Sequence, residues 1–569
     1  MRNLLRPLKN KVPQMTLIVI FLIVQAYANL TLPSYTADIV DIGIQNTDVN
    51  FIVNTGITML SMVLISVIAA VFISYLSSRV SSGFAKDLRK VVYRKVLKFS
   101  NHELNDISRS SLITRTTNDI NQIQSVIGVI FTTLLFAPIL GIGGIVKAFE
   151  LGTDLSWIIL VTFIAVAVLL IFVLLRTLPY FKITQEIIDR MNRTAREILI
   201  GIPVIKAFVR QDTERERFEA INRDFLDVNL YVYRNIFIIL PSMTLILNLM
   251  IVAILYFGAY DALNSSILTG EIIAFIQYST QIVTSFILMG GFLIILPRIL
   301  VSGRRVAEVL NTEITIADGN LEATPERPAL EFKNVCYQYP GSERQTLKDI
   351  SFKLEAGKTT AIIGGTGSGK STILNLIPRL QDPTSGEILI DGTDIKDFKL
   401  KSLRDLISFT PQKAILFQGT IRSNMLIGKS DATDDEIGTA LERSQVDFIQ
   451  SIDDEVAQGA SNFSGGQKQR LSIARAIIAK RSFYLFDDCF SALDMNTEAK
   501  VKDSLHELKE GSSILIVSQR ISTIQDADEI LVMDNGEIID RGTHNELNDS
   551  CSIYHEIVKS QIDSMEANT

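Results

Sequence analysis

The first 300 residues consist of long apolar runs separated by polar segments. About 20 apolar residues in a helix cross the ~30 Å hydrocarbon core of a bilayer. Six runs reach this length, at residues 15–35, 55–76, 126–146, 155–175, 236–260 and 272–296. One such run also suits a buried helix of a soluble protein, but six in series favour the membrane. The pattern therefore predicts an all-α transmembrane domain with six helices, at residues 1–310.

The first run has a second interpretation, as a secretory signal peptide. Four basic residues precede it, and near its end it carries Ala26, Tyr27 and Ala28, as a cleavage site does. Removal of this run would leave five spans and would place the two ends of the membrane domain on opposite sides of the bilayer. The charges of the connecting segments do not support that arrangement.

Positive charge is confined to alternate connecting segments. Residues 77–125 carry nine Lys and Arg, and residues 176–235 carry eleven, whereas residues 36–54 and 261–271 carry none. The positive-inside rule then places both termini and both long segments in the cytosol of a multi-pass protein of the cell inner (plasma) membrane. Both long segments are amphipathic and poor in helix breakers, so we expect the spans to continue as helices beyond the bilayer and to turn near residues 100–108 and 206–213.

Composition agrees with a chain that is half membrane and half soluble. The net charge of −7 and the 47% of apolar residues go with a mean hydropathy of +0.27, which is too apolar for an ordinary soluble enzyme. The 21% of charged residues is too high for a chain wholly in lipid. A sequence pI near 5.4 argues against nucleic acid as a partner. Three scattered cysteines and four scattered histidines indicate neither a disulfide framework nor a metal centre.

The second half begins after a polar linker at residues 311–328 and contains a phosphate-binding loop. A predicted strand at 359–363 leads into the G-x-x-x-x-G-K-S motif and then into an apolar helix. The motif and its flanks are Gly364, Gly365, Thr366, Gly367, Ser368, Gly369, Lys370, Ser371 and Thr372. Its glycines let backbone N–H groups converge on phosphate, Lys370 reaches the β- and γ-phosphates, and Ser371 ligates Mg²⁺. Residues 329–569 are therefore predicted to be an α/β domain that binds a nucleotide together with Mg²⁺.

Two further motifs belong to the same domain. The apolar strand at 483–486 ends in Asp487 and Asp488, at the edge where doubly wound sheets bind ligands. Asp487 would hold Mg²⁺, and Asp488 would face the attacking water. Between the strands, a second anion-binding helix start is formed by Ser464, Gly465, Gly466 and Gln467. This element need not face the same nucleotide.

These three motifs behind six spans resemble an ATP-binding cassette (ABC) exporter half-transporter of the multidrug type, over essentially the whole chain. The resemblance implies that Tyr339 stacks on adenine and that Gln412, the Q-loop glutamine, touches Mg²⁺ and the membrane domain. It implies two nucleotide domains that dimerise head to tail, so that each ATP lies between one Walker A motif and the partner's Ser-Gly-Gly-Gln signature. The turns near Asn101 and Phe208 resemble the family's two coupling helices.

Two positions depart from the family pattern, and both concern hydrolysis. The residue after the Walker B aspartate is normally Glu and is here Asp488, one methylene shorter. The switch histidine is replaced by Gln519, which cannot carry a positive charge. The signature is intact, so we hypothesise a heterodimer: this chain completes the partner's active site, and its own Walker site binds ATP but turns over slowly. The alternative is a homodimer in which Asp488 still acts as a poorer base.

The sequence says less about the cargo. The predicted spans contain no charged residue, which favours amphiphilic or apolar cargo over a small ion. Export of drug-like or lipid-like compounds is what the resemblance implies, and membrane lipids are a further expected partner. Polar residues in the spans either line a cavity or join helices; they are Gln25, Asn29, Asn248, Gln277 and Gln281. A nucleotide-gated channel or regulatory subunit remains a different class of function that fits the same motifs.

Overall fold

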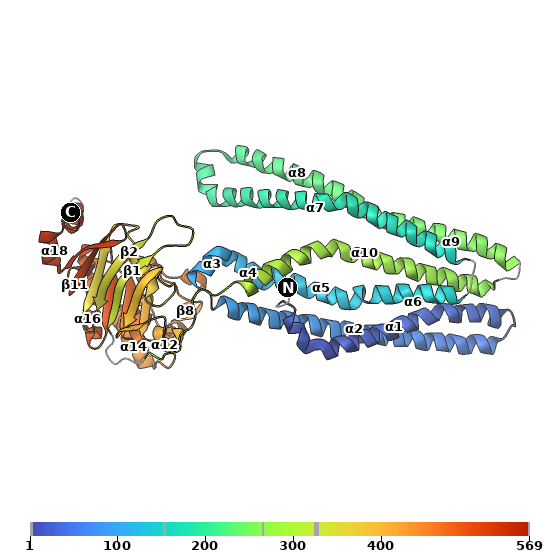
Figure 1. Ribbon diagram of the computed structural model, residues 1–569, viewed down its shortest axis with the longest axis horizontal. Helices are drawn as coiled ribbons and strands as arrows, with labels where there is room; N and C mark the ends of the chain where they lie inside the picture. The colour runs from blue at the N-terminus through green and yellow to red at the C-terminus, as the bar shows by residue number, and fades with distance from the viewer. Residues whose placement is uncertain (1–3, 152–154, 264–266, 324–328, 567–569) are drawn as a thin grey trace. The chain divides into compact units, whose positions relative to one another are not determined.

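The computed structural model describes residues 4–151, 155–263, 267–323 and 329–566 (Figure 1). The chain divides into two compact units. The first unit comprises Met1–Leu97 and Arg109–Thr312, and the second comprises Lys98–Ser108 and Glu313–Thr569. Residues 324–328 of the predicted linker, with Pro325 and Pro328, lie outside the described residues.

The first unit is built from helices, and all six apolar runs are helical as predicted. Six of its helical stretches are long and apolar enough to cross a membrane. Their segments are η1 (Arg6–Lys11), α1 (Val12–Asp38), η2 (Ile39–Ile44), α2 (Val49–Val96), α4 (Arg109–Thr114), η3 (Arg115–Asp119), α5 (Ile120–Val129), η4 (Ile130–Leu134), α6 (Phe136–Glu150), α7 (Ser156–Ala207), α8 (Gln211–Phe237), α9 (Ile239–Leu263) and α10 (Thr269–Asn311). The protein is thus a multi-pass membrane protein with six spans.

The spans extend well beyond a bilayer, as the amphipathic segments predict. Helix α2 has 48 residues and α7 has 52. At 1.5 Å per residue they are about 70 and 80 Å long, more than twice the ~30 Å hydrocarbon thickness. The third span differs from a plain helix, because the π-helical turns η3 and η4 interrupt it. Hydrophobic periodicity did not predict these turns, since one extra residue per turn barely changes an apolar pattern.

The two turns between the extended helices differ from each other. Residues 101–107 form a short helix, α3 (Asn101–Ile107), which belongs to the second unit. Residues 208–210, all described, form a tight turn between α7 and α8 and not a separate helix, contrary to the expected second coupling helix. Val209 takes a left-handed backbone conformation there (φ 53°), which lets the chain reverse within three residues.

Polar groups in the spans connect helices of the first unit. Gln281 of α10 donates to the backbone oxygen of Asn29 in α1 (3.3 Å), and the Asn29 side chain accepts from Ser66 of α2 (2.9 Å). Asn248 instead donates to the backbone of Thr244 in its own helix (2.8 Å). For Asn29 and Gln281, the structure therefore supports the interhelical role over cavity lining.

The second unit is an α/β domain with three sheets. A six-stranded sheet has the order β12-β11-β3-β10-β9-β6 and is parallel except for the β11–β12 pair. A four-stranded antiparallel sheet has the order β2-β1-β4-β5, and β7 pairs with β8. The strands are β1 (Leu330–Tyr337), β2 (Leu347–Leu354), β3 (Thr359–Gly364), β4 (Ser385–Ile390), β5 (Thr393–Asp394), β6 (Ile407–Thr410), β7 (Gly419–Thr420), β8 (Glu455–Val456), β9 (Phe483–Asp487), β10 (Ser513–Val517), β11 (Glu529–Asp534) and β12 (Glu537–Gly542).

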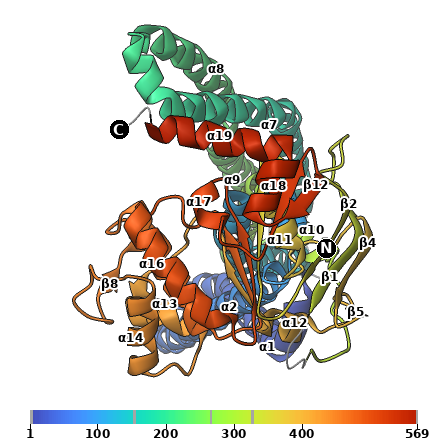
Figure 2. The same ribbon diagram turned by 90° about the vertical axis from the view of Figure 1, so that its left-hand side faces the viewer.

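One face of the six-stranded sheet is covered by helices, and the other by the antiparallel sheet together with the helices at 370–376 and 400–405 (Figure 2). Phe486 of β9 contributes to the core under the helices, and its neighbour Leu485 contributes to the core under the antiparallel sheet. This alternation explains why β9 and β10 are continuous apolar runs, as strands buried on both faces must be. The helices are α11 (Lys370–Leu376), α12 (Leu400–Asp405), α13 (Ile421–Gly428), α14 (Asp434–Arg443), α15 (Gly465–Ile478), α16 (Met495–His506), α17 (Ile521–Ile524), α18 (His544–Ser550) and α19 (Ser552–Glu566), with short 3₁₀ turns η5 (Gln458–Ala460) and η6 (Glu507–Lys509).

Candidate functional site: the nucleotide cavity

A cavity of about 310 Å³ lies at the carboxyl ends of β3, β9 and β10. Strand β10 pairs with both neighbours in register, so that Val517 lies beside Ile362 on one side and Asp487 on the other. This topology brings three sequence-distant motifs to one edge of the sheet. The cavity is lined by Tyr339, Thr346, Thr366, Gly367, Gly369, Lys370, Ser371, Thr372, Gln412, Asp487, Asp488, Val517 and Gln519.

The phosphate-binding loop has the backbone shape that its glycines predict. Gly367 and Gly369 have left-handed backbone angles (φ 88° and 100°), which glycine adopts without steric cost. A side chain at Gly364 would place its Cβ 2.1 Å from the backbone oxygen of Met533, so the loop can leave β3 only from a glycine. Gly365 and Ser368 complete the turn, and the Ser368 side chain is buried.

Lys370 is held over this loop. Its Nζ donates to the backbone oxygens of Gly364 (2.8 Å) and Gly365 (2.7 Å) and lies 3.3 Å from Ser368 Oγ. Burial lowers the pKa of Lys370, and the charges of Asp488 and Asp487 oppose that shift. An anionic phosphate would therefore gain a partly desolvated cation at the head of the loop.

Ser371 and Asp487 form an oxygen pair suited to a hard cation. Ser371 Oγ donates to Asp487 Oδ1 across 2.9 Å. Burial, followed by the nearby Asp488 carboxylate, raises the pKa of Asp487 against the lowering effect of Ser371. A divalent cation would remove that electrostatic cost, and oxygen ligands are the ones Mg²⁺ prefers. These residues therefore fit Mg²⁺.

Asp488, the residue predicted to face the attacking water, lines the cavity. It directly follows β9 in a left-handed conformation (φ 45°), fixed by a hydrogen bond from its backbone N–H to Val517 (2.8 Å). Its Oδ2 accepts from Gln412 Nε2 at 3.3 Å. Within the described chain, its Oδ1 is buried without a hydrogen-bond partner. Gln519 is exposed and also lines the cavity.

Tyr339 closes the side of the cavity where an adenine is expected. Its side chain is 40% exposed, and its hydroxyl lies 3.2 Å from Thr372 Oγ1. The ring packs edge-to-face on Tyr337, with 4.9 Å between ring centroids. A ring exposed to this extent at the cavity wall can stack on a base.

The signature lies elsewhere in the same domain. Ser464 caps α15 through a capping box, accepting from the Gln467 N–H (3.3 Å) while its own N–H donates to Gln467 Oε1 (2.8 Å). Ser464 and Gly465 are exposed, and Gly466 and Gln467 are half-buried. None of the four is among the described residues that line the cavity. Their place agrees with the expectation that the signature serves another nucleotide.

Two cavity residues were not predicted from the sequence. Val517 is the last residue of β10, and the rule that ligands bind at the carboxyl ends of parallel strands could have identified it. Thr346 precedes β2, where no motif marks it.

The fold and the cavity together define a P-loop ATP-binding protein with a six-span membrane domain. The sequence profile of the ABC transporter transmembrane region matches residues 15–286, and that of the ABC transporter domain matches residues 347–491. The first match begins within the first apolar run, which is therefore one of the six spans. The chain belongs to the ABC transporter family, with a membrane domain and an ATP-binding domain in one polypeptide.

Relatives cover nearly the whole chain. An uncharacterized ABC transporter ATP-binding protein of Mycobacterium tuberculosis is 36% identical over 99% of this chain and 97% of its own length. The putative multidrug export ATP-binding/permease protein YgaD of Bacillus subtilis is 31% identical over 86% of this chain and 85% of its own. The structure of a bacterial Atm1-family ABC exporter with ATP bound has the same fold, with a TM-score of 0.80 and 24% identity over 97% of this chain and 98% of that one.

Proposed function

We propose that this chain is one half of a heterodimeric ATP-driven exporter of amphiphilic or apolar compounds, and that its own Walker site is hydrolytically weakened. The observation that carries the proposal is Asp488. It occupies the water-orienting position with one oxygen held by Gln412 and the other unpaired. A side chain one methylene shorter than Glu holds this carboxylate about 1 Å or more from the productive position, and lost base geometry costs roughly 10²–10⁴ in rate.

The chain's own residues explain tight binding with slow turnover. The loop and Lys370 hold phosphate, Tyr339 stacks on the base, and Ser371 and Asp487, with Gln412 nearby, would hold Mg²⁺. When bound, Mg²⁺ neutralises charge that develops on the phosphates. Gln519 donates a hydrogen bond toward the γ-phosphate without a positive charge. The residues needed to bind ATP are therefore all present, whereas Asp488 is a poorer base than Glu and Gln519 lacks the charge of the switch histidine.

A partner subunit is supported by what this chain exposes. At the α7–α8 turn, Phe208 and Val209 are 73% and 79% exposed, in a segment predicted to be cytosolic. The exposed signature is intact and lies apart from the chain's own cavity. Both features are explained if a second half-transporter covers the turn and supplies the nucleotide for the signature.

ATPase assays of the purified full-length chain in lipid nanodiscs test the weakened site. We expect slow hydrolysis that Asp488→Glu accelerates about 10²-fold, the lower end of the range for restored base geometry. Lys370→Ala in the Asp488→Glu background is the control for contaminating ATPases. Brisk wild-type hydrolysis that Asp488→Asn abolishes would show that Asp488 is a competent base and would favour the homodimer.

Asymmetry between the two motifs tests the heterodimer. The complex is purified from native membranes through a tag on this chain. Ser464→Ala should remove most ATPase activity because it damages the site that the partner owns, whereas Asp488→Asn should change activity less than about twofold. In a homodimer, both substitutions would fall on one and the same kind of site and would inactivate it together.

Export of apolar cargo is tested with a fluorescent amphiphilic dye, Hoechst 33342. Inverted membrane vesicles that contain the complex should accumulate the dye with Mg-ATP and should stop when vanadate is added. Vesicles of the Lys370→Ala variant are the matched control. ATP-dependent conductance without accumulation would indicate the channel instead.

A further inference from the structure

The chain crosses between its two units at three places, and contacts on both sides tie these crossings together. It enters the second unit at Lys98, returns at Arg109, and enters it finally at Glu313. The first excursion contains α3, and the final crossing directly follows α10. The contacts within each unit determine whether these crossings can move independently.

In the second unit, Glu103 joins α3 to the segment that follows the final crossing. Its Oε1 accepts from the backbone N–H (3.0 Å) and the hydroxyl (2.7 Å) of Thr315, and its Oε2 accepts from the backbone N–H of Ser100 (2.5 Å). Glu103 is only 3% exposed. Burial acts to raise the pKa of Glu103, but the hydrogen bonds from Ser100 and Thr315 outweigh it and lower the pKa, so the carboxylate is charged.

The same short helix contacts the segment after the phosphate-binding helix. The backbone N–H of Asn101 donates to Leu380 (3.4 Å), four residues beyond the end of α11. The fully buried Arg379 fixes this segment through a bidentate pair with Asp382 (2.9 and 3.1 Å). Glu103 therefore connects the final crossing to a helix that also contacts the segment following the phosphate-binding helix.

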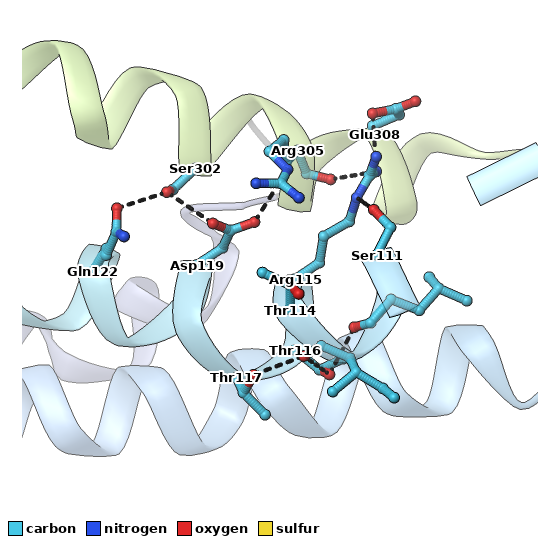
Figure 3. Close-up of polar contacts among 12 residues, drawn as sticks. Ser111, Thr114, Arg115, Thr116, Thr117, Asp119, Gln122, Ser302, Arg305 and Glu308 are labelled. Carbon is cyan, nitrogen blue, oxygen red and sulfur yellow. Dashed lines mark hydrogen bonds and ion pairs between the residues drawn. The ribbon is translucent and has the colours of Figure 1, made fainter. Parts of the chain in front are cut away.

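In the first unit, Arg115 joins the segment after the excursion to the end of α10 (Figure 3). It lies in the π-helical turn η3 and is 8% exposed. Its Nη1 donates to the backbone oxygen of Arg305 (3.0 Å) and to Glu308 Oε2 (2.9 Å). Glu308 is five residues before Glu313, where the chain finally enters the second unit.

Asp119 makes the reciprocal contact one turn away. It is 2% exposed, accepts from the Ser302 hydroxyl (3.0 Å), and lies 3.4 Å from Arg305 Nε (Figure 3). The two ion pairs have opposite polarity: η3 supplies the cation Arg115 to Glu308 and the anion Asp119 to Arg305. A slip of α10 along η3 by one turn would bring like charges together, so this arrangement fixes one register.

Ion pairs with one buried member, such as these two, contribute little to stability alone. Desolvation offsets much of their attraction, and apolar residues of similar volume often stabilise a fold as well or better. What they provide is a defined register, because each polar group must meet its own partner. These pairs lie close to the crossings. There, a fixed register between η3 and α10 lets a displacement of the second unit move both helices together.

We propose that Glu103, Arg115 and Asp119 are positioning residues that brace the crossings on both sides, so that nucleotide-driven movement of the ATP-binding unit reaches η3–α5 and α10 together. Glu103 fixes the crossings to each other in the second unit, and Arg115 and Asp119 do so in the first. The inference rests on ATP binding and on a membrane response to it. It does not depend on the cargo or on the heterodimer.

Hydrogen–deuterium exchange of the full-length protein in nanodiscs, with and without Mg-ATP and vanadate, tests this brace. Protection of residues 364–372 reports nucleotide occupancy. In the wild type, we expect exchange to change on occupancy in both residues 109–129 and residues 299–311. A wild type in which 364–372 is protected while one or both segments stay unchanged would overturn the proposal.

Glu103→Gln tests the second-unit side of the brace. It keeps the size of the side chain but removes the charge that accepts from Thr315. We expect protection of 364–372 to persist and the response of the two segments to fall about tenfold, the effect of one charge-assisted hydrogen bond. Glu546→Gln is the matched control, because Glu546 also closes a capping box, on Thr543, but makes no such cross-contact. Equal responses in the two variants would show that Glu103 acts only as a helix cap.

A charge exchange tests the first-unit side. Glu308→Arg, at a side chain that is 57% exposed, sets like charges beside Arg115 and should uncouple residues 299–311 from 109–129. Adding Arg115→Glu should restore the response to within about twofold. Asp87→Arg, on α2 beside Lys11 of η1, is the control for a reversed ion pair away from the crossings. A double variant that folds and binds ATP but stays uncoupled would contradict the proposed register.

Discussion

At the scale of single residues, two adjacent aspartates have opposite surroundings. Asp487 is buried, bonded to Ser371, and has a raised pKa, whereas Asp488 faces the cavity with one oxygen unpaired. Their chemistry follows from this difference. Burial makes the charge of Asp487 costly without a cation, and Asp488 has one acceptor oxygen without a partner among the described residues, which suits the roles predicted for them in holding Mg²⁺ and facing the attacking water.

Because the pKa of Asp487 is raised, its negative charge lowers the free energy of unfolding of the metal-free protein at neutral pH. A carboxyl whose folded pKa lies above its ordinary value of 3.8 contributes stability at low pH that is lost as pH rises through the folded pKa. We therefore expect Asp487→Asn to raise the unfolding midpoint of the metal-free protein at neutral pH by a few degrees. Calorimetry across pH checks this: the two proteins should converge in acid, and Mg-ATP should stabilise the wild type more than the variant, which keeps the loop and Lys370 but lacks one proposed Mg²⁺ ligand. A lower midpoint for the variant at every pH would contradict it.

Much of the cavity could be predicted because its motifs are local. The segment from Gly364 to Thr372 contains the glycines that its loop conformation requires. The strand β9 is so apolar that it must be buried, which places Asp487 at its end. The bond from Gln412 to Asp488 and the contact of Tyr339 with Thr372 join residues 76 and 33 positions apart, and only the packed sheets bring them together. The roles assigned to these residues stay predictions until hydrolysis is measured.

At the scale of elements, close helix packing in the membrane domain depends on small residues. The backbone N–H of Gly270, at the start of α10, donates to Asp41 Oδ1 of η2 (2.6 Å). A Cβ at Gly270 would lie 2.5 Å from the backbone oxygen of Ala37. The start of α10 and the end of the first span can approach this closely only because this residue is glycine.

Gly270→Ala should therefore destabilise the membrane domain by about 1–3 kcal/mol through overpacking. Gly291→Ala is the matched control in the same helix, since its Cβ would meet open space and alanine favours a helix by up to about 1 kcal/mol. Thermal unfolding in detergent measures both. If the two variants melt together, the close approach does not limit stability.

Hydropathy predicted the six spans because lipid leaves a crossing segment few alternatives to an apolar helix. It did not predict η3, whose buried Arg115 and Asp119 look like ordinary charges of a cytosolic helix until their partners on α10 are known. It also did not assign α3 to the second unit. That placement depends on Thr315, which is 212 residues from Glu103 in sequence.

At the scale of the whole molecule, the charge of the connecting segments predicts its orientation in the membrane. The Lys- and Arg-rich segments continue α2 and α7, and the ATP-binding unit follows α10. Both termini are then expected on the cytosolic side.

Cysteine labelling checks this orientation. Val49 and Leu97 lie at opposite ends of α2, and each is 68% exposed. In intact cells, a membrane-impermeant maleimide should label Val49→Cys but not Leu97→Cys, and both should react in opened cells. The native Cys336, Cys489 and Cys551 all belong to the ATP-binding unit and should stay unlabelled in intact cells. The reverse pattern would invert the topology.

The membership of α3 in the second unit bears on how such proteins can be recombined. An exchange of ATP-binding domains between relatives at residue 313 alone would transplant Thr315 and the segment around Leu380 without the helix that contacts them. A chimera that also exchanges residues 98–108 would keep α3 together with its native contacts at Thr315 and Leu380. The modular part of this chain is therefore discontinuous in sequence, and a successful hybrid needs two grafts.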